Sequence, residues 1–217
     1  MIMPTQDAKI FKQADVNGFL HEPDKPSGDG LVLTHGAGGN CRSPLLVRVA
    51  EAFAGAGMHV LRINLPFRQR KTFGPPFPAQ AAEDRDGIRR ASAELQKIAA
   101  GKIFMGGHSY GGRQASILLA EEAAAGAGLV LLSYPLHPPK KPEALRTAHF
   151  SEIRCGCLFV QGTKDPFGSV EELRTAVGLI PGRKEIVVIA GAGHELAKGE
   201  FDVEELVVRR SLNVWGL

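Results

Sequence analysis

Short apolar runs alternate along this chain with longer segments in which apolar residues recur at helical spacing. The apolar runs are four or five residues long, which is typical of strands buried on both faces; they lie at residues 31–34, 59–63, 103–106, 129–133, 157–160 and 185–189. The helical segments carry an apolar stripe, and they lie at residues 43–55, 79–99, 113–125, 170–177 and 201–214. Strands that alternate with helices predict an α/β fold, with a mostly parallel sheet flanked by helices on both faces.

A length of 217 residues predicts one domain over residues 1–217. The segments outside the strands and helices above are short. Residues 9–21 are expected to form an antiparallel hairpin at the sheet edge, with residues 15–17 near its turn. Two proline-dense stretches, 65–78 and 134–142, are expected to be loops. The connection between Ser133 and Cys157 is too short for a cap domain, so we expect an open, shallow site.

Composition narrows the choice of partners and compartment. A formal net charge of +3 is too small to indicate a nucleic-acid partner. No apolar stretch reaches the roughly 18 residues that span a bilayer, and the first residues lack the apolar core of a secretory signal. Three cysteines cannot all pair, and Cys155 and Cys157 are expected to be reduced thiols in a strand. We expect a cytoplasmic monomer or homodimer without a metal, cofactor or membrane partner.

The segment 107–111, Gly-His-Ser-Tyr-Gly, follows an apolar run and precedes a helical pattern. A serine between two glycines at this spacing indicates a nucleophile elbow, in which a strand turns sharply into a helix and lifts the serine hydroxyl out of the sheet. Glycine suits both flanking positions because a side chain there would meet neighbouring backbone. The alternative is a tight structural turn that carries an ordinary serine. The context favours Ser109 as a nucleophile.

An acid and a histidine follow Ser109 in the order expected of an α/β-hydrolase triad. Asp165 lies just after the strand that ends near Gln161, and His194 lies just after the last strand. His194 would take the proton of Ser109, and Asp165 would fix the imidazole tautomer and stabilise its cation. Taken alone, Asp165 could be a turn residue and His194 a loop residue. Glu171 and Glu172 are the reserve acids, whereas Glu195 is a poor candidate because adjacent side chains diverge.

A hydrolase also needs donors for the negative charge that develops on the substrate carbonyl. The backbone amide of Tyr110, at the start of the helix after the serine, is the expected first donor. The amide of Ala37 is the expected second donor, in a loop where glycines let the backbone approach the substrate. A phosphate-binding loop is a weaker alternative, because the lysine and hydroxyl pair of a P-loop is missing. We expect His35 to be structural.

The loop after residues 59–63 is basic. Arg62, Asn64, Arg68 and Arg70 are candidates for binding a carboxylate or phosphate of the substrate, with Lys71 beside them. The alternative, which we favour, is a solvated basic loop. Arg113, one turn into the helix after the nucleophile, is expected to make a structural pair beneath the site.

These motifs resemble the α/β-hydrolase superfamily, and within it the dienelactone hydrolase-like proteins of the KANL/Tex type. The resemblance covers nearly the whole chain and rests on the segments THGAGGN (34–40), RINLPF (62–67), GGHSYGGR (106–113), SYPLHPPKKPE (133–143), GTKDPFG (162–168) and GAGHEL (191–196). It implies Ser109, Asp165 and His194 as the triad. Dienelactone hydrolases proper use a cysteine nucleophile, so the serine here means that lactone activity does not carry over.

The sequence therefore predicts a serine hydrolase that acts on a small ester or thioester through an acyl-enzyme intermediate. A non-catalytic hydrolase-fold module that binds a partner protein is the alternative from a different class. An acyltransferase, in which the same acyl-enzyme meets an acceptor other than water, is a weaker third.

Overall fold

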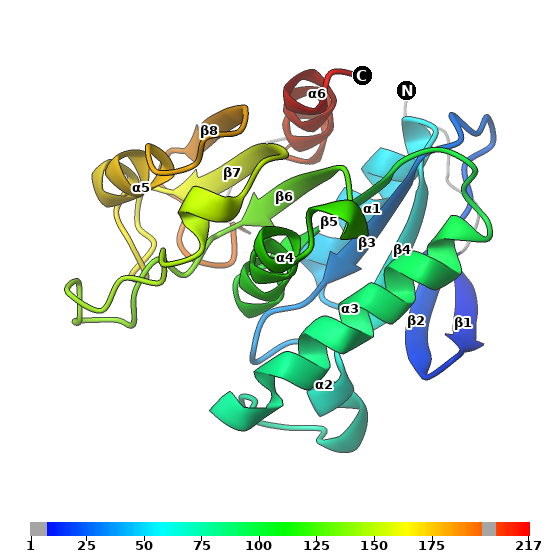
Figure 1. Cartoon of the computed structure of the whole chain (residues 1–217), viewed down its shortest axis with the longest axis horizontal. Helices are drawn as coiled ribbons and strands as arrows, with labels where there is room; N and C mark the ends of the chain where they lie inside the picture. Colours follow the sequence, from blue (N-terminus) through cyan, green and yellow to red (C-terminus); the bar gives the residue numbers. More distant parts are fainter. Residues whose placement is uncertain (1–7, 197–202) are drawn as a thin grey trace.

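The structure, a computed structural model, describes residues 8–196 and 203–217 (Figure 1). One eight-stranded sheet runs through the molecule in the order β1-β2-β4-β3-β5-β6-β7-β8. The strands are β1 (Lys9–Gln13), β2 (Val16–His21), β3 (Gly30–Thr34), β4 (His59–Asn64), β5 (Ile103–His108), β6 (Gly128–Leu132), β7 (Gly156–Gly162) and β8 (Lys184–Ile189). Strands β3 to β8 pair in parallel, whereas β2 is antiparallel to both β1 and β4. The predicted N-terminal hairpin is confirmed.

Helices cover both faces of the sheet, as predicted (Figure 1). They are α1 (Pro44–Gly55), α2 (Pro66–Arg70), α3 (Ala81–Gln96), α4 (Tyr110–Glu121), α5 (Val170–Val177) and α6 (Val203–Trp215), with single 3-10 turns η1 (Pro78–Gln80), η2 (Ala123–Ala125) and η3 (Phe150–Glu152). Helices α3, α4 and α5 pack on one face, and α1 and α6 pack on the other.

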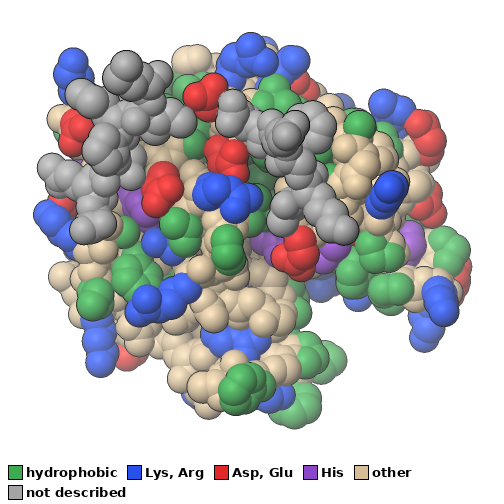
Figure 2. All heavy atoms as spheres, turned by 180° about the vertical axis from the view of Figure 1, so that it is seen from behind, with side chains coloured by type: hydrophobic (Ala, Val, Ile, Leu, Met, Phe, Trp, Pro, Cys, Tyr) green, Lys and Arg blue, Asp and Glu red, His purple; other side chains and the backbone are tan. Residues whose placement is uncertain are grey.

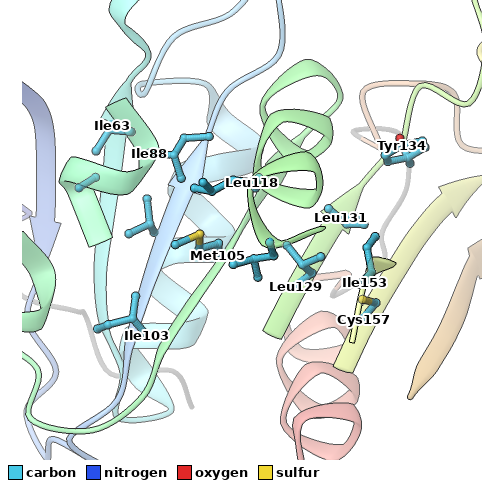
Figure 3. Close-up of a cluster of buried hydrophobic side chains, with 14 of the residues drawn as sticks. Ile63, Ile88, Ile103, Met105, Leu118, Leu129, Leu131, Tyr134, Ile153 and Cys157 are labelled. Carbon is cyan, nitrogen blue, oxygen red and sulfur yellow. The ribbon is translucent and has the colours of Figure 1, made fainter. Parts of the chain in front are cut away.

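Each face of the sheet has its own hydrophobic core. Alternate residues of a strand point to opposite faces, so Val32 and Met105 join the cluster under α3 and α4, whereas Leu31 and Phe104 join the cluster under α1 and α6. Figure 3 shows part of the first cluster, in which Met105 and Leu118 lie close together. Burial on both faces explains why the central strands read as continuous apolar runs.

The short helix α2 is the main departure from the sequence prediction, which expected a loop over residues 65–78. Proline at its first position starts this helix, and five residues are too few to show an apolar period. Tertiary packing holds it instead, because the Phe67 ring is fully buried. The predicted helix over 113–125 begins earlier, at Tyr110, and residues 201–202 of the last predicted helix lie outside the described residues.

Residues 8–196 and 203–217 include no cap domain over the sheet. The connection from β6 to β7 holds only the turn η3 and a loop that projects beyond the sheet edge (Figure 1). Within this loop, the Tyr134 hydroxyl donates to the Arg146 carbonyl at 2.7 Å.

On the face seen from behind in Figure 2, basic side chains are scattered among acidic ones. Within the part of the chain that the structure describes, no helix is long and apolar enough to cross a membrane.

The turn from β5 into α4 requires glycine at two positions. A Cβ on Gly107 would lie 2.1 Å from the Thr34 carbonyl oxygen, and a Cβ on Gly111 would lie 2.4 Å from Thr34 Oγ1 and 2.6 Å from the His35 carbonyl oxygen. Thr34 cannot move away, because its hydroxyl donates to the Gly106 carbonyl at 2.8 Å in the middle of the sheet. The end of β3 therefore packs directly against the first turn of α4.

Replacement of Gly111 by alanine tests this packing. We expect Gly111→Ala to lower the free energy of unfolding by about 1–3 kcal/mol, because the added methyl group overpacks a rigid contact. Gly55→Ala is the matched control, since a Cβ on Gly55 would meet nothing within 4 Å. Alanine should raise helix propensity there and stabilise by up to about 1 kcal/mol. Chemical denaturation measures both; equal effects would contradict the packing argument.

Buried histidines give the fold a second testable property. The pKa of His21, His35 and His149 is lowered to about 4 each, mainly by burial and, for His21 and His149, also by the nearby guanidiniums of Arg62 and Arg113. Because each folded pKa lies below that of an exposed histidine, the unfolded chain binds more protons between these values. The stability that neutral histidines contribute is thus present above pH ~6.5 and is lost as the pH falls toward ~4.

We therefore expect the free energy of unfolding, followed by urea denaturation, to fall as the pH is lowered from about 6.5 to 4. The His149→Gln variant should show a shallower fall, because one of the three histidines no longer titrates. A variant with an unchanged slope would contradict the assignment for His149.

Candidate active site

Four loops meet at the edge where the parallel strands end, and each carries a residue singled out in the sequence. Ser109 follows β5, Asp165 follows β7, His194 follows β8, and the glycine-rich loop at residues 35–40 follows β3. Strands of a parallel sheet point the same way, so the loops after them converge at this edge. The site is thus built from distant segments of the chain.

Ser109 occupies a strained turn. Its φ of 50° and ψ of −114° are unfavourable for a residue with a side chain, and its N–H is fixed by the Leu132 carbonyl at 2.8 Å. Helix α4 begins with the next residue. The turn leaves Ser109 half-buried at the C-terminal ends of the parallel strands, with its hydroxyl directed at His194.

The structure brings together the three residues of the predicted triad. His194 Nε2 lies 2.8 Å from Ser109 Oγ, and His194 Nδ1 lies 2.8 Å from Asp165 Oδ2. The other carboxylate oxygen, Oδ1, accepts a hydrogen bond from the Phe167 N–H at 2.9 Å. The Asp165 side chain is fully buried, whereas 16% of the His194 side chain remains exposed. The carboxylate is therefore held firmly, and the imidazole can be reached from solvent.

Two residues that sequence reasoning missed hold the His194 ring. His108 Nε2 donates to the His194 carbonyl oxygen at 2.8 Å, and the Phe167 ring centroid lies 4.3 Å from that of His194. Burial lowers the pKa of His108, so this ring stays neutral and adds no charge beside an imidazolium at His194. The position of His108 next to Ser109 in the motif was the only available signal, and it does not indicate this contact.

The loop after β3 turns tightly over residues 36–39, where the Gly39 N–H donates to the Gly36 carbonyl at 3.0 Å. His35 Nδ1 donates to the same carbonyl at 2.8 Å. In a trans peptide the C=O and the following N–H point in opposite directions, so this bond also directs the Ala37 N–H. No described residue accepts a hydrogen bond from the amide of Ala37 or of Tyr110. Both amides are available to a ligand.

His35 acts on the loop as a structural residue. Its Nε2 accepts a hydrogen bond from the Leu65 N–H at 3.1 Å, so the ring proton is on Nδ1. Burial lowers the pKa of His35 to about 4, which keeps the ring neutral. The loop lies against Ser109, because a Cβ on Gly36 would be 3.5 Å from Ser109 Cβ.

A buried carboxylate that the sequence did not reveal links this region to α3. Asp84 Oδ2 accepts from the Tyr110 hydroxyl at 2.7 Å, and Oδ1 accepts from the Phe67 N–H at 3.0 Å. Burial raises the pKa of Asp84 and, together with the Asp84 hydrogen bond, that of Tyr110. The contact joins α2, α3 and the start of α4 behind the Tyr110 amide.

The four candidate anion-binding residues of the basic loop have partners within the protein, and the favoured expectation of a solvated loop is wrong for Arg62 and Arg68, which are buried. Arg62 is buried and donates to His21 and to the Cys41 carbonyl, and Asn64 accepts from the Cys41 N–H. Arg68 is also buried and donates to backbone carbonyls. Exposed Arg70 pairs with Glu83. The chain itself therefore provides hydrogen-bond partners for the three guanidiniums and for the Asn64 side-chain oxygen.

The reserve acids Glu171 and Glu172 lie outside the site, and Arg113 differs from its expected role. Glu172 caps α5 through Ser169, and Glu171 pairs with Arg174, so neither replaces Asp165. The predicted ion pair of Arg113 is absent from the described residues, where its buried Nε has no hydrogen-bond partner.

Comparison with known proteins agrees with this architecture. The model of a family described as alpha/beta hydrolase domain matches residues 28–205. Est1E from Butyrivibrio proteoclasticus, solved with ferulic acid, is 17% identical with a TM-score of 0.78, and the match covers 97% of this chain and 100% of that one. XC6422 from Xanthomonas campestris, described as an a/b serine hydrolase without lid, is 16% identical with a TM-score of 0.75 over 99% and 97%.

Dienelactone hydrolase from Anabaena variabilis is 19% identical with a TM-score of 0.72, and the match covers 97% of this chain and 98% of that one. At these identities the likeness concerns the fold, and the family match covers most of the chain. The chain belongs to the alpha/beta hydrolase family, with a fold like that of dienelactone hydrolase.

Proposed function

We propose that this protein is a serine hydrolase that cleaves a small ester or thioester through the triad Ser109, His194 and Asp165. The observation that carries the proposal is the unbroken chain of two 2.8 Å contacts from the Ser109 hydroxyl through His194 to the Asp165 carboxylate. Family membership and the serine hydrolases among the similar structures support it.

The acylation step uses each of these atoms. Ser109 Oγ forms a bond to the substrate carbonyl carbon, while its proton passes to His194 Nε2. The carbonyl electron pair moves onto oxygen, and the amides of Ala37 and Tyr110 donate to that oxyanion. Asp165 accepts the Nδ1–H and stabilises the imidazolium.

The remaining steps return the enzyme to its starting state. The oxyanion collapses, the bond to the alcohol or thiol leaving group breaks, and His194 gives its proton to that group. Water then attacks the acyl-enzyme, with His194 acting again as base, and releases the carboxylic acid together with free Ser109.

The uncovered site at the C-terminal ends of the strands favours substrates with small or protruding acyl groups. The described part of the chain forms no cap domain over the triad, and it leaves His194 partly exposed. Est1E was solved with ferulic acid, which is compatible with a carboxylic acid product in such a site. We infer the substrate class from this openness.

Labelling with a fluorophosphonate tests the nucleophile. We expect the wild-type protein to be labelled and Ser109→Ala to be unlabelled, with a strongly slowed reaction in His194→Ala because the base is lost. Ser133→Ala is the matched control: Ser133 also has a φ of 50°, but its buried Oγ has no hydrogen-bond partner among the described residues. A folded wild-type protein that resists the probe would favour the non-catalytic interaction module.

The pH profile tests the base. We expect kcat/KM for a chromogenic ester to fall as the solution is made more acidic, because a protonated imidazole cannot accept the proton of the nucleophile. A rate that does not change with pH would contradict general-base catalysis by histidine.

Replacement of the acid tests the orientation of His194. Asp165→Asn offers an N–H where the imidazole needs an acceptor, so the wrong tautomer is favoured and kcat should fall by about 10⁴-fold. KM should change far less, because Asp165 is buried behind the histidine. An equal loss in Glu172→Gln would contradict the assignment of the acid, since Glu172 caps α5.

A further inference from the structure

We propose that Arg68 is a positioning residue that fixes the oxyanion loop, here defined as residues 35–40, for transition-state binding. The inference rests on the proposed function, because it concerns the donor at Ala37. It replaces the interpretation of Arg68 as a ligand for an anionic substrate.

The contacts of Arg68 identify what it holds. Its Nη2 donates to the Ala37 carbonyl at 2.7 Å and its Nε to the Gly39 carbonyl at 2.8 Å. On its other side, Nη1 donates to the Lys71 carbonyl at 2.9 Å and Nη2 to the Gly74 carbonyl at 3.0 Å. Only 7% of the residue is exposed. One guanidinium thus joins the oxyanion loop to the segment after α2 and has no free face for a substrate.

The oxyanion loop needs such a clamp because half of its residues are glycine. Gly36, Gly38 and Gly39 give it many accessible conformations, and a Cβ on Gly38 would meet nothing within 4 Å. His35 and the Gly39 N–H hold the Gly36 carbonyl, and Arg68 holds the carbonyls of Ala37 and Gly39. With the carbonyls turned toward the protein, the Ala37 N–H stays free.

The positive charge of Arg68, like its hydrogen bonds, favours binding of the transition state. Its hydrogen-bond partners among the described residues are all backbone carbonyls, so the cation stands beside the oxyanion loop without a carboxylate to neutralise it. A fixed positive charge here stabilises negative charge that develops on the substrate. A planar fork can reach both segments at once, which the single ammonium group of lysine cannot do.

Helix α2 also connects Arg68 with Tyr110, whose amide is the other proposed donor. The guanidinium carbon lies 4.8 Å from the centre of the Phe67 ring, and that ring meets the Tyr110 ring edge-on at 5.8 Å. The same short helix therefore supports the backbone of both amides, Ala37 through Arg68 and Tyr110 through Phe67.

The test compares Arg68→Met and Arg68→Lys with the wild type and with Arg89→Met, which removes an exposed arginine on α3 that pairs with Glu122. We expect kcat for a chromogenic acetate ester to fall about 10–100-fold in both Arg68 variants, with little change in KM. Affinity for a trifluoromethyl ketone, which forms a tetrahedral adduct with serine, should fall in parallel with kcat/KM. The pH profile should keep its shape, and Arg89→Met should behave as wild type.

Chemical rescue separates positioning from stability. In Arg68→Ala, added ethylguanidinium should restore part of kcat, because it can refill the space and donate to the same carbonyls. Recovery of activity without a change in melting temperature would support the inference. Folded Arg68 variants with wild-type kcat, variants in which kcat and KM change together without rescue, or variants that fail to fold would each overturn it.

Failure of the proposed function gives a different result. A wild-type protein that neither hydrolyses esters nor reacts with a fluorophosphonate removes the hydrolase itself, and the inference about Arg68 with it. An active, labelled wild type beside unaffected Arg68 variants removes only the inference.

Discussion

The backbone turn at Ser109 is the constraint on which the rest of the site depends. A residue with a side chain is held there at positive φ, between a strand that is buried on both faces and a helix that starts at the next position. Such a turn is stable only where its surroundings fix it, and here the Leu132 carbonyl and the close contacts of Gly107 and Gly111 with Thr34 do so. The sheet thus stabilises the conformation that presents the hydroxyl to His194.

Two groups of residues organise the surroundings of the Ser109 hydroxyl, one on each side. On one side, Asp165, Phe167 and His108 hold the His194 ring and its backbone, and a neutral His108 leaves the carboxylate as the charged partner of the imidazole. On the other side, helix α2 and the buried Asp84 organise the two free amides. Separate sets of residues therefore contact His194 and the segments that carry the two free amides.

The basic residues illustrate why charge along a sequence is a poor guide to ligands. Arg62 and Arg68 lie in a segment that resembles a binding loop, yet both are buried and donate to the chain itself. A guanidinium has five N–H donors in a fixed plane, which suits it to tie together several carbonyls of loops that lack regular hydrogen bonding. Near this site, the guanidiniums of Arg62 and Arg68 hold neighbouring loops in place by donating to their backbone carbonyls.

Much of this protein could be predicted from its sequence. Apolar runs and helical stripes depend on local periodicity, so the order of strands and helices, the N-terminal hairpin and the absence of a cap were predicted correctly. The glycine spacing around Ser109 and the order of Asp165 and His194 also predicted which side chains would meet, because strand ends of a parallel sheet converge. Only the tertiary structure revealed helix α2, the contact of His108 with His194, the buried Asp84 and the clamp formed by Arg68. These depend on contacts between segments far apart in the chain, and neither the periodicity of a short segment nor its charge carries information about such contacts.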